Sequence, residues 1–179
     1  MEKKNFYEFL EQEARRDGIE KIVAGGVVTN AKGEILLLTR GPDEDCMPNI
    51  DELPSGNLEK GEDIHIGLLR EVKEETGIEE KDLTIFGYID YFDYKSGSGK
   101  NARQYNFAIS TKTEKVRLSE HVAYKWQVPD QVSENKNVTA PVKRTIAIFC
   151  FNEQAKQRQQ SKKKGIVAVT KSTTKQNGD

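Results

Sequence analysis

The sequence predicts a sandwich of the α/β or α+β class, in which helices cover a β-sheet. Runs rich in Val and Ile that end at turn residues predict strands, and stretches with apolar residues at helical spacing predict helices. The two kinds of segment are mixed along the chain, as this class requires. The length of 179 residues fits one domain with short extensions.

The first third of the chain predicts a helix, a hairpin and a long loop. Residues 5–16 carry apolar side chains at helical spacing, and Gly18 follows as a stop. The apolar runs at 22–29 and 35–39 are joined by turn residues, which predicts a β-hairpin. Residues 41–61 contain several Pro and Gly residues, and a loop of this length in a compact domain is usually functional.

The remainder predicts two more helices and three more strands. Residues 62–76 form the first of these helices, because Gly77 stands in the expected C-terminal position. Strands are predicted at residues 83–94, 104–111 and 124–128, and a last helix at residues 141–156. Residues 157–179 are polar and repetitive, so we expect them to be mobile, with residues 165–170 as an alternative edge strand.

These elements divide the chain into an N-terminal helical extension (1–18), a central domain (19–156) and a basic, disordered tail (157–179). The formal net charge is −1 and the tail is basic, so the central domain must be acidic. An acidic body suits a site that holds cations. The lysines at 162–164 leave contact with nucleic acid open as an alternative to a solvated end.

The composition indicates a soluble globular protein, with 35% hydrophobic and 32% charged residues. Cys46 and Cys150 form neither a metal-type spacing nor a dense disulfide framework, which favours a reducing compartment. The N-terminus shows no apolar stretch of signal-peptide length, and no apolar run approaches the ~20 residues of a membrane span. We therefore expect a cytoplasmic protein with no membrane partner, and its oligomeric state stays open.

The segment 56–78 carries the functional prediction. At about 100° per residue, Glu71, Glu74 and Glu75 fall within one arc of roughly 100° on the helix surface. A neighbouring apolar stripe consists of Ile64, Leu68, Leu69, Val72 and Thr76. The helix is therefore expected to bury one side and to present three carboxylates on another.

Three carboxylates placed this closely repel one another unless a cation compensates their charge. Hard divalent ions take oxygen ligands and often share them between carboxylates and substrate phosphates. Such ions polarise a phosphoryl oxygen and orient an attacking water. We therefore expect Mg²⁺, with Mn²⁺ as the alternative, and hydrolysis of a phosphoanhydride bond. A solvated charged face is the other interpretation, but the Gly-rich loop, the Arg and the Gly stop at fixed distances disfavour it.

The same segment resembles the signature of the Nudix hydrolases: Gly, five residues, Glu, seven residues, Arg-Glu, an aliphatic residue, any residue, Glu-Glu, any residue, Gly and an aliphatic residue. Every specified position is filled, from Gly56 through Ile78. The preceding Glu52-Leu-Pro-Ser-Gly56 is similar too. It departs from the family at Ser55 and Asp51, where a second Gly and an aromatic residue are common.

The resemblance implies an α/β/α sandwich with a mixed β-sheet, and it makes residues 19–156 a Nudix domain. The metal ligands that it implies are Glu71, Glu74, Glu75 and the backbone carbonyl of Ser55. Arg70 would hold the glutamates in place by charge-assisted hydrogen bonds.

The general base is placed in this family either on the same helix or on a later loop. The first arrangement makes Glu71 and Glu74 candidates, and the second makes Glu120 the candidate. The deprotonated base would activate a water molecule for attack on phosphorus. Relatives often have a basic residue that faces phosphate where Arg40 ends the second strand, and Arg103 is a further candidate for this contact.

The expected substrate is a small molecule that contains a nucleoside diphosphate linked to another group. A nucleoside triphosphate, including an oxidised one, is the first choice because the chain carries little beyond the domain. A dinucleoside polyphosphate is the second, since Tyr94 stands at the distance from the signature at which some such relatives carry a Tyr. ADP-ribose, nucleotide sugars and RNA 5′ ends remain as alternatives. A non-catalytic nucleotide-binding regulator is disfavoured, because such proteins usually lose signature glutamates.

Overall fold

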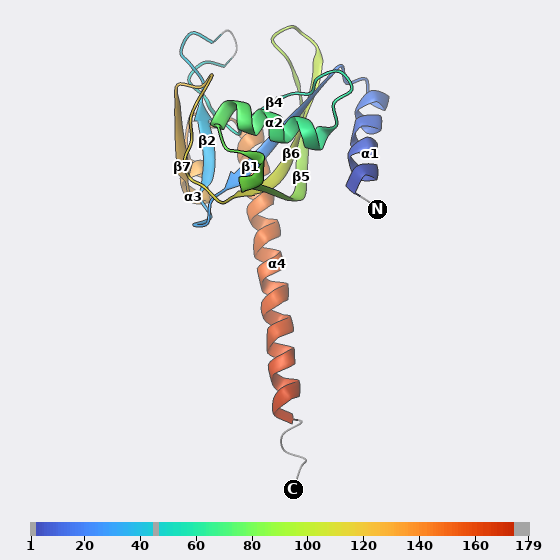
Figure 1. The fold of residues 1–179 in the computed structure, drawn as a ribbon, viewed down its shortest axis with the longest axis vertical. Coiled ribbons are helices and arrows are strands. Elements are labelled where there is room, and N and C mark those ends of the chain that lie inside the picture. The colour runs from blue at the N-terminus through green and yellow to red at the C-terminus, as the bar shows by residue number, and fades with distance from the viewer. Residues whose placement is uncertain (1–2, 45–46, 174–179) are drawn as a thin grey trace.

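A computed structural model describes residues 3–44 and 47–173 of the chain. It confirms an α/β/α sandwich, in which a mixed sheet lies between two helical layers (Figure 1). The elements are α1 (Lys3–Arg16), β1 (Lys21–Thr29), β2 (Ile35–Thr39), β3 (Asp51–Glu52), β4 (Ser55–Asn57), α2 (Ile64–Thr76), a short 3-10 helix η1 (Glu80–Asp82), β5 (Leu83–Lys95), β6 (Asn101–Thr111), β7 (Ala123–Gln127), α3 (Pro129–Glu134) and α4 (Ala140–Thr173).

The sheet follows the order β3-β2-β1-β6-β5, with β4 paired to β1 and β7 paired to β2. β1 and β6 run parallel, whereas the other strand pairs are antiparallel. The predicted hairpin partners β1 and β2 meet where Thr29 lies opposite Ile35. Further along, β4 pairs with β1 at Ser55 opposite Gly25, and β3 pairs with β2 at Glu52 opposite Leu38. The segment from Asp51 to Asn57 therefore bridges two diverging strands.

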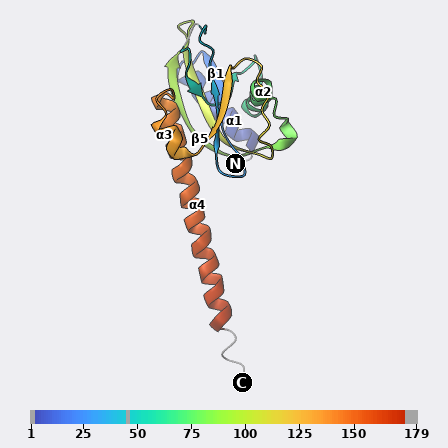
Figure 2. The same ribbon diagram turned by 90° about the vertical axis from the view of Figure 1, so that its left-hand side faces the viewer.

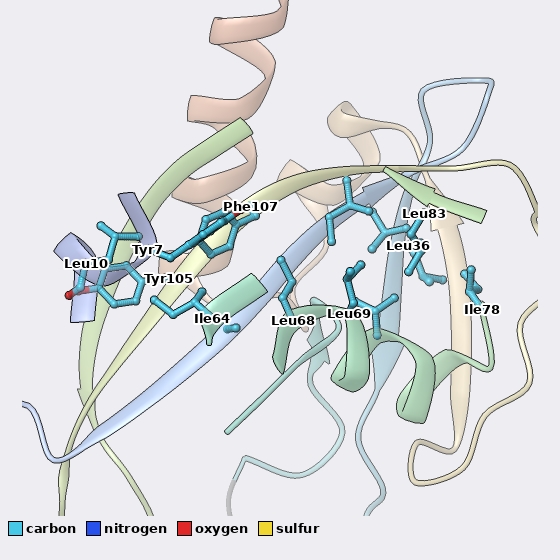
Figure 3. Close-up of a cluster of buried hydrophobic side chains, with 14 of the residues drawn as sticks. Tyr7, Leu10, Leu36, Ile64, Leu68, Leu69, Ile78, Leu83, Tyr105 and Phe107 are labelled. Carbon is cyan, nitrogen blue, oxygen red and sulfur yellow. The ribbon is translucent and has the colours of Figure 1, made fainter. Parts of the chain in front are cut away.

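Each face of the sheet has its own apolar core. Figure 3 shows the layer under α2, where Ile64, Leu68 and Leu69 lie beside side chains of the sheet. Helix α1 extends this layer, and its Leu10 carbonyl accepts a hydrogen bond of 2.7 Å from the buried Tyr105 hydroxyl. The second layer, under α3 and α4, consists of Val27, Ile35, Leu37, Leu53, Ala108, Val132, Val138, Val142, Ile146 and Phe149. Figure 2 shows α2 and α4 on opposite sides of the sheet.

Helix α2 begins and ends at residues that satisfy its terminal backbone groups. The Asp63 side chain accepts a hydrogen bond from the amide of His65, 2.8 Å away, as an N-cap does. Gly77 has a φ of 67° and donates its amide to the Lys73 carbonyl. A residue with a side chain would be strained in this left-handed conformation, so a glycine ends the helix here.

The predicted elements in the body of the protein are confirmed, with boundaries that differ by a few residues. Within the loop predicted at 41–61, however, the structure contains β3 and β4, which are too short to give a recognisable pattern. Helix α3 was also not predicted, because six residues provide no helical periodicity.

The last helix is longer than predicted. It continues past residue 156 to Thr173, so the edge strand considered at residues 165–170 is wrong. Composition accounts for the extension as far as residue 164, because residues 153–164 are mostly Glu, Gln, Ala, Lys and Arg, which favour a helix without needing an apolar stripe. The division of the chain at residues 18 and 156 stays a prediction, and residues 174–179 of the tail, like Cys46, lie outside the described residues. No helix in the described part of the chain has the length and apolar content needed to cross a membrane.

The α2 layer predicts a measurable contrast in stability. Leu68 is fully buried, so Leu68→Ala should lower the free energy of unfolding by about 2–5 kcal/mol. Ile66 on the same helix is 61% exposed, and Ile66→Ala should change the free energy of unfolding by less than about 0.5 kcal/mol. Urea denaturation followed by circular dichroism measures both values. Equal losses for the two variants would contradict the described orientation of α2.

Candidate active site

Arg70 is the centre of the polar side of α2. Its guanidinium donates two hydrogen bonds of 2.8 Å to Glu62, one from Nε to Oε1 and one from Nη2 to Oε2. Nη1 donates to Glu71 at 2.8 Å and to Glu74 at 3.0 Å, and Nη2 also donates to the Asn57 carbonyl at 3.0 Å. The pKa of Arg70 is therefore raised, chiefly by the hydrogen bonds to Glu62, and its charge is shared among three carboxylates.

Glu71 lies against the backbone of β4. A Cβ atom added at Gly56 would be 2.0 Å from the carboxyl carbon of Glu71, so this close approach requires a glycine. The side chain of Glu71 is 14% exposed. Burial raises the pKa of its carboxyl group, and the hydrogen bond from Arg70 acts in the opposite direction. The first glycine of the signature thus allows a carboxylate to sit directly on the strand.

Glu75 is the most unusual group of the site. It is 7% exposed, and its Oε2 accepts a hydrogen bond of 2.9 Å from the Ser55 amide, which places the Ser55 backbone beside this carboxylate. Burial raises the pKa of Glu75 to about 8. The neighbouring carboxylates of Glu52, Glu71 and Glu120 act in the same direction. Glu75 is therefore a carboxyl group that needs a compensating cation to ionise easily at neutral pH.

The remaining two glutamates lie at the open side of this cluster. The Glu74 side chain is 56% exposed and is held by Arg70. Glu120, in the loop before β7, is also exposed, and its charge raises the pKa of both Glu71 and Glu75. The charge of Glu120 therefore acts on two of the α2 glutamates, although Glu120 is 45 residues further along the chain than Glu75.

Glu52 connects Arg40 with a histidine that sequence reasoning left without a role. Its Oε1 accepts a hydrogen bond of 3.1 Å from Arg40 Nη1 and lies 3.0 Å from His121 Nε2. The other ring nitrogen, Nδ1, is 3.9 Å from Glu75 Oε1 and has no hydrogen-bond partner among the described residues. Arg40, 26% exposed, also donates to Glu44. Glu52 stood in the quoted lead-in sequence, but its two partners could not be read from spacing.

Arg103 lies elsewhere. Its side chain is 3% exposed and donates hydrogen bonds to Asp93, at 2.7 and 2.8 Å, and to Asp17, at 3.0 Å. The guanidinium also stacks over the Tyr91 ring, 4.0 Å from its centroid. These contacts join the residue that follows α1 to the sheet and engage the Arg103 guanidinium, and the substrate contact of Arg103 stays a prediction.

The donor chemistry of the glutamate cluster fits a hard divalent cation. Carboxylate oxygens are the ligands that Mg²⁺ and Mn²⁺ prefer, and a nearly buried carboxylate surrounded by others gains most from such an ion. Within the described residues, no three His, Cys, Asp or Glu side chains are grouped closely enough to hold an ion in the present arrangement. Arg70 instead supplies the positive charge to Glu71 and Glu74.

Comparison with known proteins gives the class to which this fold and this site belong. The family model described as NUDIX domain matches residues 20–149. A MutT-like protein of Streptomyces ambofaciens is 33% identical over 124 residues, which are 69% of this chain and 73% of that protein. The chain therefore belongs to the Nudix hydrolase family.

Two further relatives have more specific names. The 8-oxo-dGTP diphosphatase of Escherichia coli K12 is 33% identical over 69 residues, which are 38% of this chain and only 53% of that enzyme. A Caenorhabditis elegans Ap4A hydrolase, solved as a binary complex, superimposes with a TM-score of 0.66 at 25% identity. That alignment covers 75% of this chain and 98% of the hydrolase.

The raised pKa of Glu75 predicts a pH-dependent stability of the metal-free protein. Because the pKa in the folded state, about 8, lies above the ordinary 4.5, the folded state holds a proton that the unfolded state releases. The stability that this proton provides is complete below about pH 4.5 and is lost as the pH rises through about 8. Wild type should therefore lose stability relative to Glu75→Gln over this range.

Thermal unfolding of both proteins in EDTA, at several pH values across this range, measures the effect. Addition of Mg²⁺ above the upper pKa should stabilise wild type more than Glu75→Gln, because the ion binds the ionised carboxylate. Parallel pH profiles of the two proteins would contradict the assignment of a buried, protonated Glu75.

Proposed function

We propose that this protein hydrolyses a phosphoanhydride bond in a nucleoside triphosphate with the help of a divalent metal ion. The observation that carries the proposal is the buried carboxyl group of Glu75, which accepts a hydrogen bond from the Ser55 amide and whose pKa the charges of Glu71 and Glu120 raise further. Two of these carboxyl groups have raised pKa values, which mutual repulsion reinforces. Proteins retain such a cluster at sites where a cation or a proton transfer uses it.

The residues divide into groups that hold the ion, the substrate and the attacking water. The ion would be held by Glu71, Glu74, Glu75 and the Ser55 carbonyl. When bound, Mg²⁺ or Mn²⁺ supplies positive charge that offsets the phosphate charge and polarises a P–O bond. Arg70 fixes the Glu71 and Glu74 carboxylates by the hydrogen bonds described above.

Glu120 is the proposed general base. It is exposed at the edge of the cluster, so a water molecule can reach it, and an ionised carboxylate there accepts the proton that the water loses. Glu71 and Glu74 are the alternative bases on α2. Arg40 is the proposed contact for a substrate phosphate, because it lies at the end of β2 and shares Glu52 with His121, which itself lies beside Glu75.

The relatives favour two substrate classes. The similarity to the 8-oxo-dGTP diphosphatase supports a nucleoside triphosphate, including an oxidised one. The structural likeness to the Ap4A hydrolase, which extends over nearly all of that protein, supports a dinucleoside polyphosphate as the second candidate. Both contain the phosphoanhydride bond that the glutamate cluster is proposed to act on.

A substrate panel with Mg²⁺ tests the proposal. It includes triphosphates, oxidised triphosphates, dinucleoside polyphosphates, ADP-ribose and RNA with a 5′-triphosphate, and it measures release of phosphate and pyrophosphate. Glu74→Gln should lower kcat by about 10²-fold or more, because the side chain keeps its size but loses the charge that binds the ion. Glu8 is an exposed glutamate on α1, so Glu8→Gln serves as the matched control and should be as active as wild type.

The pattern of turnover across the panel decides the substrate. Hydrolysis of triphosphates, lost in Glu74→Gln and kept in Glu8→Gln, is the expected result. Preferential hydrolysis of dinucleoside polyphosphates would select the second candidate. Nucleotide binding without turnover of any panel member would reject the hydrolase proposal in favour of a binding role.

A further inference from the structure

The loop that carries Glu120 is attached to both sides of the glutamate cluster. This loop (residues 112–122) joins β6 to β7 and has no regular secondary structure over most of its length. Two side chains that are direct neighbours of Glu120 make hydrogen bonds to different elements. Ser119 contacts α2, and His121 contacts Glu52 on β3.

On one side, the loop satisfies backbone groups that α2 leaves without partners. The last four carbonyls of a helix have no partner within the helix. Here the Ser119 hydroxyl donates to the Glu74 carbonyl at 2.6 Å, and the Arg117 amide donates to the Thr76 carbonyl at 2.8 Å. The Gly77 amide donates a hydrogen bond to the Lys73 carbonyl. The C-terminal end of α2 is thus the surface to which the loop is attached.

On the other side, His121 attaches the loop to β3. Its imidazole is 6% exposed, and Nε2 lies 3.0 Å from Glu52 Oε1. This contact joins the imidazole of the loop to a side chain of β3. The next amide, of Val122, donates to the Thr39 carbonyl at 3.0 Å. Glu120 therefore lies between two attachment points, one on a helix and one on the sheet.

These attachments oppose a repulsive force. The Glu120 charge raises the pKa of Glu71, because negative charges on the two carboxylates repel each other and tend to push an exposed loop away. An unattached loop would relieve the repulsion by moving into solvent. A base must lie within hydrogen-bond reach of the water that it activates, so such a movement would remove it from the reaction.

We propose that Ser119 and His121 are positioning residues that hold the Glu120 carboxylate at the α2 glutamates. This inference rests on the role proposed above for Glu120. Ser119 acts through the end of α2, and His121 acts through Glu52, which also holds Arg40. The two bonds thus keep the proposed base and the proposed phosphate contact in one arrangement.

The first test measures motion and needs no substrate. Backbone ¹⁵N relaxation of the full-length protein should give the Glu120 amide an order parameter of about 0.85, as for a rigid backbone. Ser119→Ala and His121→Ala should each lower it to below about 0.6. Ser119→Thr and His121→Gln, which keep a donor at the same place, should restore most of the order.

A matched control separates this effect from the loss of any serine hydroxyl. Ser133 also donates to a backbone carbonyl, that of Asp130 at 2.7 Å, but within α3. Ser133→Ala should leave the Glu120 amide as rigid as in wild type. An unchanged order parameter in both Ser119→Ala and His121→Ala would overturn the proposal, whatever the activity of the protein.

The second test asks whether the two residues act through Glu120. In the wild-type background, each alanine variant should lower kcat by about 10-fold or more, with KM changed less than about twofold, because a misplaced base affects the chemical step. In the Glu120→Gln background, the same substitutions should lower kcat by less than about twofold further, because the group that they position is already absent.

The outcomes distinguish the two proposals. If Glu120→Gln keeps the wild-type kcat, the role of Glu120 in the proposed function is wrong. If Glu120→Gln lowers kcat but Ser119→Ala and His121→Ala do not, only the positioning role is rejected. If each alanine substitution lowers kcat by the same factor in the Glu120→Gln background as in wild type, Ser119 and His121 act independently of Glu120. That result would also reject the positioning role.

Discussion

Arg70 provides the charge balance on which the arrangement of α2 depends. The last turn of a helix carries the negative end of the helix dipole, where carboxylates are disfavoured by about 0.3–1 kcal/mol each. This helix nevertheless places Glu74 and Glu75 there, with Glu71 one turn earlier. One guanidinium binds Glu71 and Glu74, and its bidentate contact with Glu62 fixes its own orientation. Glu75 lies outside this network, and burial raises the pKa of its carboxyl group to about 8.

The sheet contributes to the site through two short strands, β3 and β4, that pair with β2 and β1. Because β1 and β2 are paired only beside their turn, at Thr29 and Ile35, the short strands β3 and β4 can pair with the parts of β1 and β2 that lie further from it. This arrangement brings Ser55 to the end of α2. Asp51 anchors the start of β3, because its fully buried carboxylate accepts hydrogen bonds from Thr39, Lys125 and Asn135. A carboxylate thus stands where an aromatic residue is common in the family, and these three donors hold it.

The sequence was sufficient for those features that depend on local spacing. The apolar stripe of α2 follows from a period of 3.6 residues and its end from Gly77, and the structure contains both. Of the three glutamates expected on a separate face, Glu75 instead lies among the buried residues of the helix. It was not sufficient for contacts between residues far apart in the chain. His121 and Glu52 are 69 positions apart, and Arg103 and Asp17 are 86 apart. Only the strand order decides that such pairs meet, which is why the burial of Arg103 could not be foreseen.

The long C-terminal helix changes how the molecule moves in solution. From Phe149, which is still buried in the core, α4 runs on to Thr173 and leaves the body of the protein (Figures 1 and 2). Lys156 Nζ still lies 5.5 Å from the centroid of the Phe86 ring on β5. At 1.5 Å per residue, the helix from there to Thr173 projects by about 26 Å, more than one and a half times the radius of gyration of about 16 Å expected for a compact chain of this length. Such a particle has a large frictional coefficient and elutes early from a sizing column. Its molar mass in solution therefore has to come from light scattering or sedimentation equilibrium, because an elution volume alone would make a monomer look like a dimer.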